Sequence, residues 1–357
     1  MTNVIKAALT AVLCSLLVQG CDASSSEPKA LRAIEKGLSR EMESTGFSGA
    51  VLVARGDQEW LSVARGLADR ERGVANTRET RFRLGSMNKM FTGVAIVQLA
   101  QAKRLDFQAT LGTYLPDYPN RELASKVTIH HLLTHQGGTG NIFGPEFEAH
   151  RNELRAIDDY IALFGKRAVR FEPGSKFEYS NYGYVLLGAV IEKVSGQSYY
   201  DYVQKHIFEP AGMSSTGSEP EDQTVEARAV GYMEDGKSNT ATLPYRGSPA
   251  GGGYSTVGDM HRFAQALLAH RLLDAQHTEL LLTRKVSGED DDGYAYGFGD
   301  ARSKGGRGWV GHNGGAPGMN GALRIYPRSG YVVVALANVD PPAAEDVCGW
   351  ISKRLPD

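Results

Sequence analysis

The pattern of apolar and polar residues predicts strands at both ends of the chain and helices between them. Apolar positions in FSGAVLVARG (47–56) and QEWLSVARG (58–66) flank a Gly-Asp turn, which is typical of a β-hairpin. ALRIYP (322–327) and YVVVALANV (331–339) predict a second hairpin. Residues 86–285 are dominated by helical spacing. These patterns predict one antiparallel sheet built from both chain ends, with a helical region beside it.

The first twenty residues form a separate segment. MTNVIK carries one positive charge, AALTAVLCSLLV is a short apolar core, and VQGC places a small residue before Cys21. The segment resembles a bacterial lipoprotein signal peptide, which implies cleavage after residue 20 and lipidation of Cys21. Plain secretion is the alternative, because Gln19 is unusual in that motif. We therefore expect a lipid-anchored protein of the cell envelope that faces the periplasm.

The rest of the chain is predicted to be one domain behind a short tether. Residues 21–28 are polar and are assigned to the tether, and residues 29–357 are assigned to the domain. Its sheet part is expected at about 29–67 and 295–357, and its helical part at about 68–294. With 41% hydrophobic residues in 357, the chain has enough apolar material for a packed core.

Charge and cysteine content narrow the possible partners. The formal net charge is −2 and no stretch is strongly basic, so a small-molecule or peptide substrate is favoured over nucleic acid. Of the three cysteines, Cys14 leaves with the signal, Cys21 would carry lipid, and Cys348 remains without a partner for a disulfide. No metal site is predicted, because the histidines of VTIHHLLTH lack carboxylate or cysteine partners nearby, and no cofactor is implied.

One lysine stands in an apolar run. In LGSMNKMFTGVAIVQLA (84–100), a helix that begins at Ser86 would place Lys89 on the same face as the serine hydroxyl. Burial would lower the pKa of the lysine, and a neutral amine could then accept the serine proton. The alternative is that Ser86 caps the helix and Lys89 extends to solvent.

Two further stretches favour the catalytic interpretation. Tyr179-Ser180-Asn181 precedes a helical run, and His312-Asn313-Gly314-Gly315 lies ahead of a strand. Together with the Ser86–Lys89 pair, they resemble the S-x-x-K, Y-x-N and [KH]-x-G motifs of the serine β-lactamase and penicillin-binding-protein superfamily. The order and spacing are similar to its class C-like branch, which includes DD-peptidases, D-aminopeptidases and family VIII-type carboxylesterases.

The resemblance implies a fold and a set of site residues. The fold is α+β, with a five-stranded antiparallel sheet from both chain ends, terminal helices packed on it and a helical subdomain. The implied catalytic residues are Ser86, Lys89 and Tyr179. The implied substrate-binding residues are Asn181, His312 and Gly314. The implied oxyanion hole consists of the backbone N–H groups of Ser86 and Gly315. Whether Lys89 or Tyr179 is the general base stays open.

The third motif bears on the substrate. Where many relatives present a lysine ammonium to a substrate carboxylate, this chain has His312, which is largely neutral at pH 7. We therefore expect a DD-peptidase-like or D-amino-acid peptidase, or a carboxylesterase, ahead of a class C-like β-lactamase. A non-catalytic protein that binds peptidoglycan fragments or penicillin is the alternative of another class. GTGNIFGPEFEAH (138–150) is expected at the rim of the cleft, and the oligomeric state stays open.

Overall fold

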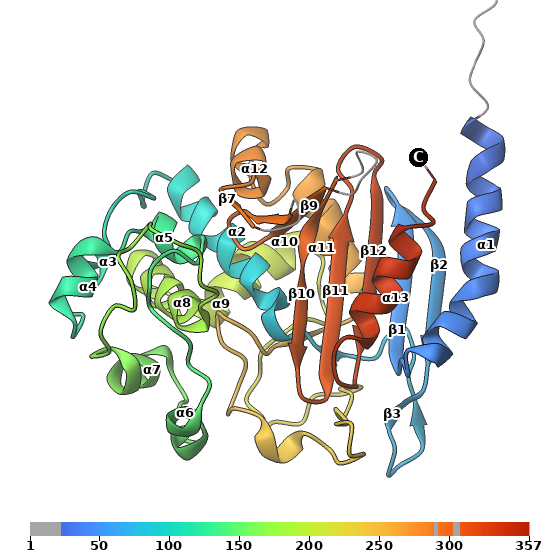
Figure 1. Cartoon of the computed structure of the whole chain (residues 1–357), viewed down its shortest axis with the longest axis horizontal. Coiled ribbons are helices and arrows are strands. Elements are labelled where there is room, and N and C mark those ends of the chain that lie inside the picture. The colour runs from blue at the N-terminus through green and yellow to red at the C-terminus, as the bar shows by residue number, and fades with distance from the viewer. Residues whose placement is uncertain (1–22, 289–291, 303–307, 357) are drawn as a thin grey trace, which may run out of the picture.

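The computed structural model describes residues 23–288, 292–302 and 308–356. These residues form one large antiparallel sheet and the helices that pack around it (Figure 1). The predicted signal peptide (1–20) and Cys21 lie outside the described residues. The strand order is β2-β1-β12-β11-β10-β9-β8-β7. The sheet strands are β1 (Gly49–Arg55), β2 (Gln58–Arg65), β7 (Val286–Ser287), β8 (Asp292–Tyr294), β9 (Gly299–Arg302), β10 (Gly308–Ala316), β11 (Met319–Ile325) and β12 (Tyr331–Ala337).

Helices fill most of the middle of the chain. They are α1 (Ala23–Ser44), α2 (Asn88–Gln101), α3 (Leu111–Tyr114), α4 (Arg121–Lys126), α5 (Ile129–Leu133), α6 (Pro145–His150), α7 (Ile157–Phe164), α8 (Asn181–Ser195), α9 (Tyr199–Val203), α10 (Glu209–Ala211), α11 (Val257–Leu268), α12 (Ala275–Leu282) and α13 (Ala343–Ser352). Two small antiparallel pairs join them: β3 (Leu67–Asp69) with β4 (Val74–Ala75), and β5 (Phe82–Arg83) with β6 (Tyr254–Ser255).

The sheet confirms the α+β prediction and corrects its strand count. The two predicted hairpins form β1–β2 and β11–β12, and β1 pairs with β12, so the chain ends do share one sheet. The sheet has eight strands rather than five, because β9, β8 and β7 extend it beyond β10. These added strands are only two to four residues long, and β8 and β9 consist mostly of glycine and charged residues, so they lack the apolar pattern that marks a strand.

The central strands are buried on both faces. In β1, Ala50, Leu52 and Ala54 belong to the core shared with the helical part, whereas Val51 and Val53 face the core under the terminal helices. Successive side chains of a strand point to opposite faces, so one strand serves both cores. Helix α13 lies across the β11–β12 face, with α1 beside it, and α11 packs on the opposite face (Figure 1).

The N-terminal helix corrects the predicted tether. Helix α1 begins at Ala23, so most of the segment assigned to the tether at residues 21–28 is helical. That stretch contains no glycine, and its alanine, serine and glutamate residues are compatible with a helix, whereas Pro28 is the one residue there that disfavours it. None of the helices among the described residues is both long enough and apolar enough to cross a membrane.

Candidate active site

The serine and the lysine lie where a short 3-10 helix runs into the buried helix α2. A 3-10 helix, Gly85–Met87, leads directly into α2. Helical structure therefore begins at Gly85, one residue before Ser86. Helix α2 is buried on nearly all sides, where it packs against α8, α9 and α12. The Lys89 side chain is fully buried in consequence, which excludes the interpretation in which it extends to solvent.

Three oxygen atoms surround the Lys89 amine. Nζ lies 2.7 Å from Asn181 Oδ1, 2.5 Å from the Ala250 carbonyl oxygen and 3.3 Å from Ser86 Oγ. Burial lowers the pKa of Lys89 well below its usual value, and a neutral amine has two N–H groups and one lone pair. The carbonyl oxygens of Asn181 and Ala250 can only accept, so they take both N–H groups. The lone pair is left for the hydroxyl of Ser86, which can donate.

Tyr179 lies over the same amine. Lys89 Nζ is 4.7 Å from the centre of the Tyr179 ring and 5.4 Å from that of Tyr184. Burial raises the pKa of the Tyr179 phenol, while a hydrogen bond with the Ser86 side chain opposes that shift. Tyr179 therefore stays a neutral phenol at pH 7, which makes it a hydrogen-bond donor rather than a phenolate.

A buried histidine that the sequence does not single out as a site residue supports this tyrosine. His135 lies with its ring centroid 4.3 Å from that of Tyr179 and 4.7 Å from that of Tyr294. Its Nδ1 accepts the backbone N–H of Ser180 at 3.0 Å, and its Nε2 makes no hydrogen bond to any described residue. Burial holds the pKa of His135 well below 6.5. A neutral imidazole thus packs behind Tyr179.

The second motif is held at the start of helix α8. Ser180 caps the helix by accepting the Gly183 N–H at 2.9 Å, so Asn181 becomes its first residue. Asn181 Nδ2 donates to Asn141 Oδ1 at 2.9 Å, and that oxygen also accepts the Ile142 N–H at 2.8 Å. These bonds fix the amide orientation that turns Asn181 Oδ1 toward Lys89. Asn141 is therefore a part of the site that motif spacing does not reveal.

The third motif lies within strand β10 rather than ahead of it. His312 Nε2 lies 2.9 Å from the Tyr294 hydroxyl, and its Nδ1 lies 2.5 Å from the Asn313 carbonyl oxygen. Burial lowers the pKa of His312 to about 3, so its ring is neutral at physiological pH. Gly314 is also buried, because a Cβ there would lie 1.9 Å from the Leu84 carbonyl oxygen. Neither residue lines the cavity beside Ser86, so their predicted contact with substrate stays a prediction.

Gly315 does reach the cavity, and it lies against the turn that carries the serine. Gly85 has φ +52°, and a Cβ on it would come 2.9 Å from the backbone nitrogen of Gly315. Only glycine meets both conditions without strain. Both Ser86 and Gly315 line the cavity, which is the placement that the predicted oxyanion hole needs. Their role as its donors stays a prediction.

The cavity next to Ser86 has a volume of about 400 Å³ and is mainly apolar. Its larger apolar side chains are Ile142, Phe143, Phe147, Leu243, Pro244 and Met319. Among the described residues that line it, Glu148 is the one with a formal charge. The predicted rim segment, 138–150, supplies Ile142, Phe143, Phe147 and Glu148, so its placement at the cleft is confirmed. In the described part of the chain, no group of three or more His, Cys, Asp or Glu residues could hold a metal ion.

The fold and this arrangement match a known class of protein. The family model described as Beta-lactamase matches residues 34–355, so the chain belongs to the β-lactamase family, as its motifs predict. The protein is a serine hydrolase with the fold shared by β-lactamases and penicillin-binding proteins.

Individual relatives give the class more detail. A penicillin-binding protein of Bacillus subtilis (strain 168) is 30% identical over 316 residues, which cover 82% of this chain and 68% of that protein. The crystal structure of a penicillin-binding protein from Bacillus halodurans shares 36% identity at a TM-score of 0.81, over 88% of this chain and 99% of that one. A D-stereospecific amidohydrolase from Streptomyces sp. shares 25% identity at a TM-score of 0.73, over 90% and 97%.

Proposed function

We propose that the protein hydrolyses an ester or amide through an acyl-enzyme on Ser86, with Lys89 as the general base. The observation that carries this proposal is the hydrogen bonding of the buried amine. Asn181 and Ala250 accept both of its N–H groups, at 2.7 and 2.5 Å, and leave the lone pair for Ser86. This arrangement supports Lys89 over Tyr179 as the base, since burial keeps the tyrosine a phenol.

The proposed reaction has two stages. As Ser86 Oγ bonds to the substrate carbonyl carbon, its proton passes to Lys89 Nζ, and the backbone N–H groups of Ser86 and Gly315 stabilise the oxyanion. The Tyr179 phenol passes a proton to the leaving oxygen or nitrogen, and the Lys89 proton restores the phenol. Water then attacks the acyl carbon, gives up its proton to the same pair, and Ser86 leaves with a proton as the hydroxyl.

The cavity favours a substrate without a carboxylate near the scissile bond. It offers Glu148 and no cationic side chain among the described residues that line it, and His312 is neutral and turned toward Tyr294. A carboxylate buried there would be unpaired, which is costly. Carboxylesters and the amides or peptides of D-amino acids are therefore favoured, and a penicillin, with its carboxylate beside the lactam ring, is disfavoured. The likeness to a D-stereospecific amidohydrolase supports the amide branch.

The proposed location is the cell envelope, with a lipid anchor on Cys21 and the domain facing the periplasm. It rests on the signal-like residues 1–20. Expression of the full chain with Cys21→Ser tests it. The wild-type protein is expected in the membrane fraction and the variant in the soluble fraction, and an unchanged distribution would refute the anchor.

A substrate panel tests the reaction. The purified protein is incubated with p-nitrophenyl esters of neutral acids, with D- and L-amino-acid p-nitroanilides and with a fluorescent penicillin. We expect turnover of an ester or a D-anilide, loss of that turnover in Ser86→Ala, and slower reaction with the penicillin. Ligand binding that Ser86→Ala leaves intact, together with no turnover by the wild-type protein, would favour the non-catalytic binding protein.

A further inference from the structure

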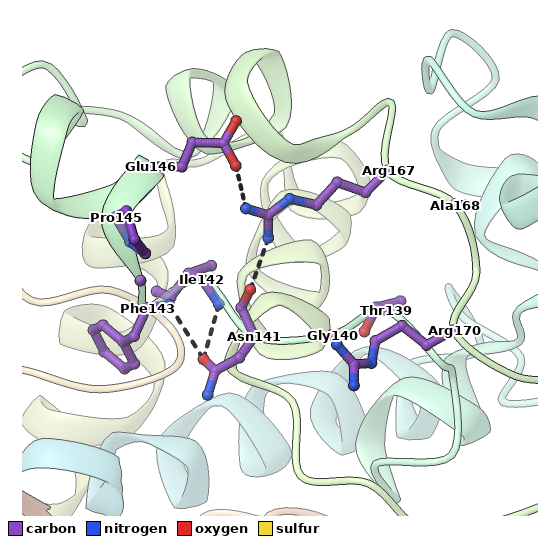
Figure 2. A pocket seen from close by; sticks show the side chains of 11 residues that line it. Thr139, Gly140, Asn141, Ile142, Phe143, Pro145, Glu146, Arg167, Ala168 and Arg170 are labelled. Atoms are coloured by element: carbon purple, nitrogen blue, oxygen red, sulfur yellow. Dashed lines mark hydrogen bonds and ion pairs between the residues drawn. The ribbon is translucent and has the colours of Figure 1, made fainter.

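A second cavity adjoins the one that contains Ser86. It has a volume of about 520 Å³ and is lined by residues 139–146 and by Arg167, Ala168 and Arg170 (Figure 2). Ile142 and Phe143 line both cavities, so the two share a wall. The proposed reaction uses only the first cavity, which leaves the second without an assigned role.

The second cavity, unlike the first, is lined by cationic side chains. Arg167 donates to the Asn141 carbonyl oxygen at 2.8 Å and forms an ion pair with Glu146, so its charge is balanced (Figure 2). Arg170 has its Nε 2.6 Å from a Glu178 oxygen, but Lys176 lies 3.2 Å from the other oxygen of that carboxylate. Two cations therefore share one anion, which leaves a net positive charge at this edge.

Arg170 has donors to spare. Its side chain is 61% exposed, and its ion pair with Glu178 is made through Nε, so that pair does not use the two terminal nitrogens. Figure 2 shows the guanidinium beside Gly140 with no interaction drawn to the other lining residues. A guanidinium with both terminal N–H groups free is suited to a bidentate contact with a carboxylate.

The shared wall carries an exposed aromatic side chain. Phe143 is 58% exposed, which is the largest value among the exposed large hydrophobic residues of the described chain. It touches Phe147, whose ring centroid is 5.2 Å away. An exposed apolar side chain at the border of two cavities is suited to cover the aliphatic part of a ligand that passes from one into the other.

We propose that the second cavity binds a carboxylate at the far end of the substrate. The substrate would then be an ester or amide whose scissile bond lies at Ser86, whose chain crosses Phe143, and whose terminal carboxylate pairs with Arg170. This inference rests on the proposed function and adds the substrate class to it. It agrees with the exclusion of a carboxylate near the scissile bond, because of the two cavities only the second is lined by cationic side chains.

Matched substrates test the proposal. The first series consists of mono-p-nitrophenyl esters of linear dicarboxylic acids with four to eight carbons, which carry the carboxylate on the acyl group. The second series consists of S-butyryl mercaptoalkanoic acids of graded length, which carry the carboxylate on the leaving group. Each compound is paired with its methyl ester, which lacks the charge. The wild-type protein is expected to show a KM for at least one acid about two- to fivefold below that of its methyl ester, as one exposed ion pair would give.

Substitution of the arginine identifies the source of the preference. In Arg170→Gln the ratio of the two KM values is expected to fall to about one, and raising the salt from 0.05 to 0.5 M should reduce it in the wild-type protein. Arg78→Gln, at an arginine paired with Glu59 on strand β2, is the control and should keep the wild-type ratio. Equal KM values in both series, or a preference that survives in Arg170→Gln, would overturn the proposal.

Failure of the inference can be told apart from failure of the proposed function. Turnover of the methyl esters that Ser86→Ala abolishes would leave the hydrolase proposal intact even with no preference for the acids. If no ester is turned over, calorimetry on the Ser86→Ala protein still decides the question with adipic acid monoamide and its methyl ester. Tighter binding of the acid that Arg170→Gln removes supports the second site, and equal or absent binding of both refutes it.

Discussion

Replacement of Lys89 by methionine should change how the stability of the protein depends on pH. Methionine has a similar length and fits an apolar site, but it carries no amine. In the unfolded chain the lysine has a pKa of about 10.4, so at pH 7 it must lose its proton on folding if it is to serve as the base. The native state then binds one proton fewer at this residue than the unfolded state, so the contribution of Lys89 to the free energy of unfolding rises with pH.

The magnitude follows from the burial of the side chain. Lys89 is fully buried and its pKa is lowered by that burial alone. While the native amine is neutral and the unfolded one is charged, each pH unit contributes about 1.4 kcal/mol, or about 3 kcal/mol between pH 7 and 9. The variant also leaves Asn181 Oδ1 and the Ala250 carbonyl oxygen without a donor, at about 1–3 kcal/mol each. That cost does not depend on pH, so the slope is diagnostic and the absolute stability is not.

Urea unfolding of both proteins at pH 7, 8 and 9 measures the difference. The stability of the wild-type protein relative to Lys89→Met should increase by about 3 kcal/mol over that range, and activity should be lost in the variant at every pH. Lys193→Met, at an exposed position of helix α8, is the matched control and should give a constant difference. A constant difference for Lys89→Met as well would mean that the buried amine is charged at pH 7, and the reasoning would fail.

Three further predictions concern the neighbours of Ser86 and Lys89. Asn141→Asp keeps the oxygen that accepts from Asn181, but it adds a carboxylate that only the Asn181 side chain separates from Lys89. The negative charge should raise the pKa of the Lys89 amine. The acid limb of the pH–rate profile should then move to higher pH, and an unmoved limb would exclude this link. Tyr179→Phe should lower kcat by about a hundredfold with a smaller change in KM, because the phenol donates only as the leaving group departs; equal turnover would remove it from the reaction. Gly85→Ala should lower the free energy of unfolding by about 1–3 kcal/mol and should lower kcat. The residue has φ +52°, which alanine disfavours, and its new Cβ would also lie too close to the Gly315 nitrogen. An unchanged melting temperature would contradict the contact.

Local patterns account for the parts of the fold that were predicted. The hairpins β1–β2 and β11–β12 combine apolar runs with short turns, and both properties are visible in a few neighbouring residues. Strands β7, β8 and β9 are too short and too polar for such a pattern, and they exist because β10 offers an edge for pairing. Pairing with an edge formed by distant residues cannot be seen in local periodicity.

The candidate site likewise contains residues that local spacing predicts and residues that it does not. The spacing of Ser86 and Lys89 on one helical turn is local, so the sequence alone places their side chains together. Asn141, His135 and Ala250 enter the site from loops that only tertiary packing brings near Lys89, and no residue spacing indicates them. The orientation of a buried ring such as His312 likewise depends on distant partners.

Covalent labelling tests the central claim most directly. A fluorophosphonate probe, which forms a tetrahedral adduct with an activated serine, is added to the purified wild-type protein and to Ser86→Ala, and the adduct is located by peptide mass spectrometry. We predict one adduct on Ser86 in the wild-type protein and none in the variant. Absence of an adduct, or an adduct on another residue, would contradict the assignment of Ser86 as the nucleophile.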